Sequence, residues 1–221
     1  MSPLLNQIKR VSEMLLDLVY PPRCAHCGRV DWRWCPTCAA ALHTFPLDLT
    51  RRTIPHIDAS AATGRHSGLL QHAVHALKYN GAIDVALPLG ARMAAAVSAC
   101  GWQCDRIVAV PLARSRLRER GYNQCQVIGS CMAEIIQKPI APPESLVRLR
   151  ETPTQLGRDH AGRRANVRAA FQADAKHVSG AVILLLDDVM TSGATLQECA
   201  LSLRAAGARA VLSLTVTEAR L

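Results

Sequence analysis

Two adjacent carboxylates and a hydroxyl-rich turn are the residues of this chain best placed to do chemistry. Asp187 and Asp188 directly follow four branched apolar residues, 183–186, which are typical of a strand buried on both faces. Carboxylates accept hydrogen bonds from neighbouring hydroxyls, such as the vicinal diol of a ribose. The turn that follows supplies hydroxyl donors, a flexible glycine and the start of a helix, at Thr191, Ser192, Gly193 and Thr195. Because glycine turns and helix N-termini bind phosphate, the segment predicts a site for a ribose 5-phosphate.

The plainer alternative for this segment is a parallel strand, a polar loop and a helix capped by Thr195, with both acids solvated at the edge of the sheet. Most strand–loop–helix units carry no ligand. Ordinary loop chemistry, however, does not require two acids, a Thr-Ser-Gly turn and a second threonine in uninterrupted succession. The order of these residues therefore favours the ligand site.

A second chemical signal is a set of four cysteines in two CxxC pairs, which are separated by seven residues: Cys24, Cys27, Cys35 and Cys38. This spacing can bring four thiolates around one ion and leaves no position for water, so we expect a structural zinc site. An iron–sulfur centre is the minor alternative. His26 is expected to be a bystander rather than a ligand. The other five cysteines are expected to pack as small apolar residues, at Cys100, Cys104, Cys125, Cys131 and Cys199.

Positive charge is the third signal. The formal net charge is +9, and residues 114–168 hold eleven Lys or Arg against five Asp or Glu. A row of alternating arginines follows a predicted strand: Arg114, Arg116, Arg118 and Arg120. In an extended loop part of this row points one way, which favours contact with pyrophosphate or a nucleic-acid backbone; the alternative is a solvated basic turn. Further candidate contacts are Lys78, Arg148, Gln155, Arg158, Arg163 and Arg164.

The acids need a sheet to position them, and apolar periodicity predicts one. We expect strands at 57–62, 106–110, 181–186 and 210–217, with helices at 69–77, 83–99, 123–136 and 196–206. This alternation predicts an α/β fold, in which a parallel sheet has helices on both faces and ligands bind at the carboxyl ends of the strands. Prolines bracket a polar linker at 47–54, so we expect two domains: 1–45, an N-terminal helix with the cysteine module, and 56–221.

Several blocks of this sequence resemble those of the ComF family, and the 183–196 segment resembles the phosphoribosyl pyrophosphate (PRPP) motif of type I phosphoribosyltransferases. The blocks are His75–Gly81, Val110–Gln124, Leu149–Gln155 and Arg164–Phe171. The resemblance implies a phosphoribosyltransferase-like domain joined to a zinc-ribbon-like module. It assigns PRPP binding to Asp187, Asp188, Val189, Met190, Thr191, Ser192, Gly193, Ala194 and Thr195, with Asp187 and Asp188 catalytic and Mg²⁺ accompanying PRPP.

The same resemblance implies a role in competence and DNA uptake or in nucleotide-related metabolism. One function is a pentosyl transferase (a glycosyltransferase) that moves 5-phosphoribosyl from PRPP to an acceptor and releases pyrophosphate. The alternative is a non-catalytic component that binds single-stranded DNA, works with other competence proteins and uses the PRPP site for regulation or not at all. Arginines and tryptophans around the cysteines suit either single-stranded nucleic acid or packing on the neighbouring domain, at Arg23, Arg29, Trp32, Arg33 and Trp34.

The remaining patterns bear on location and on loops. Leu4–Tyr20 has apolar residues at helical spacing interrupted by charges, which predicts an amphipathic helix rather than a signal sequence. We expect no membrane insertion, and a set of nine cysteines with paired spacing favours the reducing cytoplasm. Thr152–Gly162 has little regular pattern and is predicted to close over a substrate. Candidate proton carriers are His72, His75 and His160.

Overall fold

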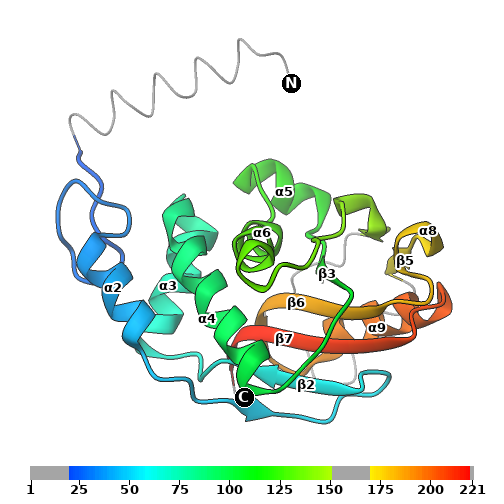
Figure 1. Cartoon of the computed structure of the whole chain (residues 1–221). Helices are drawn as coiled ribbons and strands as arrows, with labels where there is room; N and C mark the ends of the chain where they lie inside the picture. The colour runs from blue at the N-terminus through cyan, green and yellow to red at the C-terminus, as the bar shows by residue number, and fades with distance from the viewer. Residues whose placement is uncertain (1–19, 151–169, 220–221) are drawn as a thin grey trace.

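The computed structural model describes residues 20–150 and 170–219 and has a five-stranded sheet at its centre (Figure 1). The strand order is β1-β2-β7-β6-β3. The strands are β1 (Thr50–Arg51), β2 (Ala59–Ala62), β3 (Arg106–Ala109), β6 (Val182–Met190) and β7 (Ala210–Glu218). β2, β7, β6 and β3 run parallel, and β1 pairs antiparallel with β2 at one edge. The predicted α/β fold with a mainly parallel sheet is therefore confirmed.

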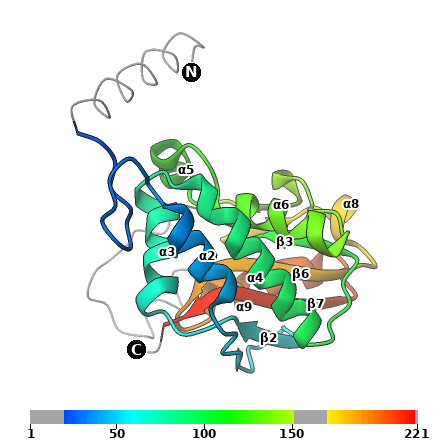
Figure 2. The same cartoon turned by 60° about the vertical axis from the view of Figure 1, so that its left-hand side comes forward.

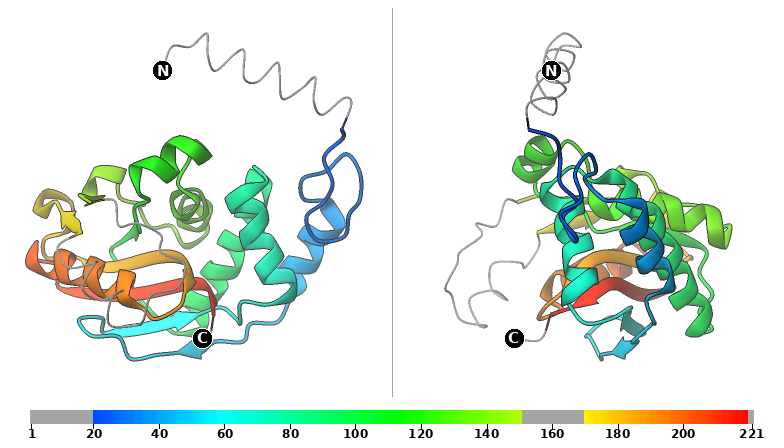
Figure 3. Two further views of the ribbon diagram at one scale, coloured as in Figure 1. Left: turned by 180° about the vertical axis from the view of Figure 1, so that it is seen from behind. Right: turned by 90° about the vertical axis from the view of Figure 1, so that its left-hand side faces the viewer.

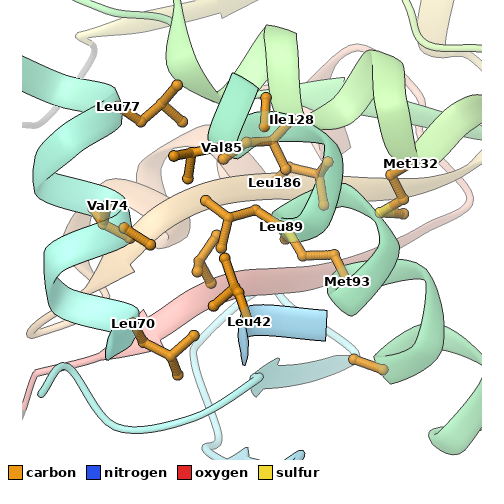
Figure 4. Close-up of a cluster of buried hydrophobic side chains, with 14 of the residues drawn as sticks. Leu42, Leu70, Val74, Leu77, Val85, Leu89, Met93, Ile128, Met132 and Leu186 are labelled. Carbon is orange, nitrogen blue, oxygen red and sulfur yellow. The ribbon is translucent and has the colours of Figure 1, made fainter. Parts of the chain in front are cut away.

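Helices cover both faces of this sheet, because β6 sends alternate apolar side chains to opposite sides. Leu184 and Leu186 pack with α3 (Gly68–Tyr79), α4 (Ala86–Ala99) and α6 (Gln124–Ile136), as Figure 4 shows for Leu186. Ile183 and Leu185 lie in a second cluster, with residues of α9 (Ala194–Ala205). The sheet is thus the middle layer of three.

A small two-stranded sheet lies beside α9. It consists of β4 (Leu146–Arg148) and β5 (Phe171–Ala173), preceded by the 3-10 turn η2 (Pro143–Ser145) and followed by α8 (Ala175–Val178). The Ala173 amide donates to the Ser202 hydroxyl of α9 at 2.7 Å. Figure 3 shows this sheet and α8 at the same end of the molecule as α9. None of these short elements was predicted from the sequence.

Close contact between α4 and α6 depends on glycine. A Cβ atom on Gly90 of α4 would lie 2.7 Å from the Cys131 Cβ and 3.0 Å from the Ile128 carbonyl oxygen, both on α6. No side chain fits in that space without a shift of the backbone. The glycine therefore allows α6 to approach α4, and α6 begins beside the two acids.

The cysteine module, residues 23–44, shares a hydrophobic cluster with the α/β domain. Its helix α2 (Pro36–Thr44) packs beside α3 and α4 (Figure 2). Leu42 of α2 is fully buried, and in Figure 4 it lies among Leu70, Leu89 and Met93. The module and the larger domain are therefore held by one continuous core.

Two local expectations were wrong. The strand predicted at 181–186 continues to Met190, because β7 pairs with it as far as Glu218. The arginine row, predicted to be an extended loop, forms the helix α5 (Arg114–Arg120), which ends at Gly121 in the left-handed conformation with φ of 84°. Arginine, leucine and glutamate are good helix formers, which explains the helix.

Other expectations need only adjustment or lie outside the described residues. The predicted linker contains β1, and the helix expected at 83–99 begins as the 3-10 turn η1 (Ile83–Val85) before α4. The segment Thr152–Gly162 lies outside the described residues, as does Leu4–Tyr20 apart from its last residue. Within the described part of the chain, no helix has the length and apolar character needed to span a membrane.

Candidate functional site

The two acids lie on β6 beyond the point where its neighbour ends. β3 stops at Ala109, opposite Leu186, so neither acid has a partner on β3, and Asp187 pairs with Thr215 of β7. The first residues of α6 lie on the β3 side of β6, beyond the end of β3. Its N-cap Asn123 accepts a hydrogen bond from the Cys125 amide at 3.0 Å and donates to the Val110 carbonyl at 3.0 Å. This tie between β3 and α6 places the first residues of α6 against the acids.

Asp188 is buried, with 4% of its surface exposed, and is held on both oxygens. Lys78, from the last turn of α3, contacts its Oδ1 at 2.6 Å, and the Gln124 side-chain amide donates to Oδ2. Burial by itself lowers the pKa of Lys78, but the charge and hydrogen bond of Asp188 outweigh it and raise that pKa above its ordinary value. Lys78 is therefore a charged, internal partner of Asp188.

Asp187 is only partly buried and is held less tightly. Its Oδ1 accepts from the Asp188 amide at 2.9 Å and from the Cys125 thiol at 3.5 Å, and no hydrogen bond or ion pair from the described residues engages Oδ2. Burial, followed by the negative charge of Asp188, raises the pKa of Asp187 to about 7. Burial also raises the pKa of the Cys125 thiol, which keeps it a proton donor. Asp187 is thus a carboxylate that exchanges a proton near neutral pH.

The hydroxyl-rich loop enters α9 through Gly193, whose φ of 79° is in the left-handed region. α9 begins at Ala194, two residues before the start of the helix predicted at 196–206, and Gly193 is its N-cap. The Ser192 hydroxyl accepts from the Ala194 amide at 3.4 Å, whereas the next two amides, of Thr195 and Leu196, have no partner within the helix. Helix N-termini with free amides bind anions, so the loop suits a phosphate.

Residues of the predicted linker hold this loop from outside. Arg52 donates to the Thr191 carbonyl at 2.7 Å and forms an ion pair with Glu218 at 3.3 Å. A Cβ atom on Gly193 would lie 3.2 Å from Ile54 Cδ1, so the turn has little room for a side chain. Two members of the predicted segment serve packing instead: Met190 is buried in the second cluster, and Val189 packs partly buried against the first.

The predicted cations divide into two groups. Lys78 pairs with Asp188 directly, whereas Arg120 is connected to that acid through Gln124, because it donates to the Gln124 side-chain oxygen. Arg120 also lies over the Tyr79 ring, 5.7 Å from its centroid. Arg116 pairs with Glu119 at 3.2 Å on the surface of α5, and Arg114 and Arg118 are exposed. Residues two apart on a helix do not share a face, so the row does not form one binding edge.

The four module cysteines gather in one cluster that could hold a metal ion. Their sulfurs lie within 4.8 Å of one another, with Cys24–Cys38 at 3.7 Å and Cys27–Cys35 at 3.6 Å. Zinc–sulfur bonds of about 2.3 Å arranged tetrahedrally require sulfurs about 3.8 Å apart, so the residues fit the ion. Burial opposes ionisation of Cys24, but backbone N–H groups of neighbouring residues outweigh it and lower its pKa to about 6, which favours a thiolate ligand.

Around this cluster lie His26, which was predicted to be a bystander, and the arginines and tryptophans predicted either to bind nucleic acid or to pack on the neighbouring domain. The His26 ring contacts His72 of α3, with 2.8 Å between the two Nδ1 atoms, and lies outside the four-sulfur group. Trp34 is buried, whereas Trp32 is 44% exposed. Arg33 donates to the Asn80 carbonyl at the end of α3, at 3.2 Å. The module therefore packs on α3 through some of these residues and presents others to solvent.

Four residues at the site were missed from the sequence. They are Gln124, Cys125, Arg52 and His66, and the last contacts the Thr217 hydroxyl at 2.8 Å. Burial and the nearby charge of Lys78 lower the pKa of His66. Asn123 at the head of the predicted helix 123–136 was a usable signal, since an N-cap fixes which residues begin the helix. Nothing comparable singled out His66 or Arg52.

Comparison with known proteins gives relatives by sequence and weaker likenesses by structure. No protein-family model matches the chain. The protein named DNA utilization protein YhgH from Escherichia coli (strain K12) is 29% identical over 195 residues, which cover 85% of each chain. The protein of the same name from Salmonella typhimurium is 28% identical over 202 residues, with the same coverage.

Among solved structures, the allosteric regulatory enzyme of purine biosynthesis superposes with a TM-score of 0.41 at 22% identity over 60% of this chain. The glutamine PRPP amidotransferase from B. subtilis gives 0.40 at 25% identity over 58%. This chain spans about a quarter of each of those enzymes, 26% and 25%. The orotate phosphoribosyltransferase of Mycobacterium tuberculosis gives 0.37 at 13% identity, with 82% of both chains covered. By sequence, then, the chain is similar over most of its length to proteins named for DNA utilization.

Proposed function

We propose that this protein binds PRPP at the carboxyl end of β6, over Asp187–Thr195. The observation that carries the proposal is the single strand–loop–helix unit, in which a partly exposed carboxylate precedes a left-handed glycine turn and helix amides that have no partner within the helix. Asp187 and Asp188 serve the ribose end, and the loop from Thr191 to Thr195 serves the 5-phosphate. Mg²⁺ would accompany PRPP and would help to neutralise the charge of the pyrophosphate as it leaves.

The reaction that this arrangement supports is transfer of the 5-phosphoribosyl group. An acceptor forms a bond to C1 of the ribose while the bond from C1 to the pyrophosphate oxygen breaks, and pyrophosphate leaves with the electron pair. Cations near the leaving oxygens stabilise the charge that accumulates there. Among the described residues, two predicted cations are linked to the acids: Lys78 pairs with Asp188, and Arg120 donates to Gln124, which in turn donates to Asp188.

The biological setting that we propose is DNA uptake or a nucleotide-related step in the cytoplasm, with zinc as the structural ion of the cysteine module. The relatives named DNA utilization protein support the setting. The second candidate function is binding of single-stranded DNA without catalysis, together with other competence proteins. The exposed Arg114 and Arg118 on α5 and the exposed Trp32 favour it, because exposed cations and aromatic faces suit a single strand.

Calorimetry with Mg²⁺ and PRPP tests the first proposal. The protein is expected to bind PRPP, and Asp187→Ala combined with Asp188→Ala is expected to abolish binding while circular dichroism stays unchanged. Asp84→Ala, on an exposed residue of η1, is the matched control and is expected to bind as the native chain does. Unchanged affinity in the double variant would remove the site assignment.

An acceptor screen separates the two candidate functions. Pyrophosphate release on mixing PRPP with nucleobases supports the transferase. Absence of release across all acceptors, together with salt-sensitive binding of single strands, supports the DNA-binding component.

A further inference from the structure

A polar chain of four side chains connects the surface of α5 with the buried acid. Arg120 donates to the Gln124 side-chain oxygen, the Gln124 nitrogen donates to Asp188 Oδ2, and Lys78 contacts Asp188 Oδ1 at 2.6 Å. Gln124 and Asp188 are 3% and 4% exposed. Water therefore has little access to these contacts, and each partner depends on the next one.

Gln124 is suited to this place by its chemistry. A carboxamide accepts on its oxygen and donates from its nitrogen, so one side chain satisfies a cation on one side and a carboxylate on the other. A glutamate would repel Asp188, and an apolar residue would leave both neighbours without their partner. A buried polar group without a hydrogen-bond partner destabilises the folded state, and hydrogen bonds to charged groups are stronger than those between neutral groups.

The two acids therefore differ in what they can still bind. Both oxygens of Asp188 are engaged by protein side chains, whereas Asp187 is partly exposed and uses only Oδ1 among the described residues. A ribose hydroxyl can reach Asp187 without breaking an ion pair. At Asp188 it would have to displace Lys78 or Gln124.

We propose that Asp188 is a structural anchor, a carboxylate held by Lys78 and Gln124 rather than by the ligand, and that Asp187 is the carboxylate that contacts the ribose. Gln124 is then a positioning residue that links an anion bound at Arg120 to Asp188. The inference deepens the proposed function and rests on it. Because Arg120 holds the Gln124 oxygen and lies over Tyr79, the neighbour of Lys78 on α3, an anion at Arg120 acts on both residues that hold Asp188. The pyrophosphate and ribose ends of the site are then coupled.

The first test compares two glutamines of α6. Gln124→Met is expected to weaken binding of Mg²⁺–PRPP roughly tenfold or more. The matched control is Gln126→Met, because Gln126 is partly buried on the same helix and its side chain, among the described residues, has one hydrogen bond, at 3.4 Å to the Ala141 carbonyl. Its affinity is expected to stay within about twofold of the native value. Equal affinities for the Gln124 variant and the native chain would overturn the positioning role.

Coupling is tested by a double-mutant cycle on the same binding measurement. Arg120→Gln and Gln124→Met are expected to be non-additive, since either change breaks the same chain. Arg116→Gln, which removes only a surface pair with Glu119, is expected to add independently to the Gln124 change. Additive effects for Arg120 and Gln124 would overturn the link between them.

A measurement without ligand separates this inference from the proposed function. Lys78→Met leaves the buried Asp188 carboxylate without its counter-ion and is expected to lower the Tm, whereas adding Asp188→Asn is expected to recover part of the loss. If the Tm of the double variant did not recover, the role of Asp188 as an anchor would be overturned, whether or not PRPP binds. If recovery is seen and the native protein does not bind PRPP, the anchor stands, while the proposed function and the ribose contact of Asp187 are both overturned.

Discussion

Asp187 makes the stability of this protein depend on pH in a direction that can be worked out. Its pKa is raised from 3.8 in the unfolded chain to about 7 in the folded one. Between these values the folded state holds a proton that the unfolded state has lost, so stability decreases as pH rises from about 4 to about 7. Asp187→Asn removes the titrating group. We expect the variant to be more stable than the native protein by about 1–3 kcal/mol near pH 8 and to show a flatter dependence on pH.

Urea unfolding near pH 5 and near pH 8 measures this difference. Asp84→Asn changes an exposed acid of η1 and serves as the control, with the native pH dependence expected. If the free energy of unfolding of the Asp187 variant depended on pH as it does in the native protein, this carboxylate would not be the cause of the pH dependence.

Gly193 tests the turn that leads into α9. Its φ is 79° and a Cβ atom would lie 3.2 Å from Ile54, whereas Gly180 has φ of 72° with no heavy atom within 4 Å of the same position. Gly180→Ala therefore measures the cost of backbone conformation alone, about 1 kcal/mol. Gly193→Ala is expected to cost more, because the contact with Ile54 adds to the strain. Equal losses of free energy of unfolding in the two variants would mean that the Ile54 side chain moves aside without a measurable energetic cost.

At the scale of elements, long periodic segments could be predicted from the sequence and the short ones could not. The strand before Asp187 was predicted because four apolar residues fill both faces, but its extension to Met190 depends on β7, a partner far away in the chain. The helix α5 was misread because the alternation of arginine was given more weight than the helix propensity of arginine, leucine and glutamate.

The same reasoning explains the candidate site. The acids, the hydroxyl loop and the four cysteines are continuous or closely spaced motifs, so their chemistry could be read locally. Gln124 is an uncharged residue inside a helix, and its two polar contacts come from α5 and β6 only after folding. Arg52 reaches the hydroxyl loop from a segment that was predicted to be a linker. Roles that arise from tertiary contact alone had no local signal.

α5 itself provides a test of the DNA-binding alternative. Arg114 and Arg118 are one turn apart and exposed, so they share a solvent-facing side of α5. Replacing both by glutamine is expected to weaken binding of single-stranded DNA and to reduce the slope of log affinity against log salt by roughly 1.4, about 0.7 for each lost phosphate contact. PRPP affinity, measured by calorimetry, should stay at the native value. If the variant lost PRPP binding while the salt dependence of its DNA affinity stayed the same, these arginines would contact PRPP rather than DNA.

On the scale of the whole molecule, the cysteine module and the acid pair are joined by α3. Leu42 and Trp34 of the module lie in the same cluster as Leu70 and Val74 of α3, and the last turn of α3 carries Lys78. Arg33 of the module donates to Asn80 directly after that turn. Loss of order in the module should therefore also destabilise α3, including its last turn, which positions Lys78 beside Asp188.

Replacing Cys24 and Cys27 by serine tests this connection. We expect loss of bound zinc in metal analysis, since two of four ligands are gone, and faster amide hydrogen exchange in α3 as well as in the module. PRPP affinity is expected to fall because Lys78 is no longer held in place. Cys104→Ser changes a buried cysteine outside the module and should leave the zinc content native. If exchange quickens only in residues 20–45, α3 is held by the sheet and by α4 alone, and the metal has no influence on the acids.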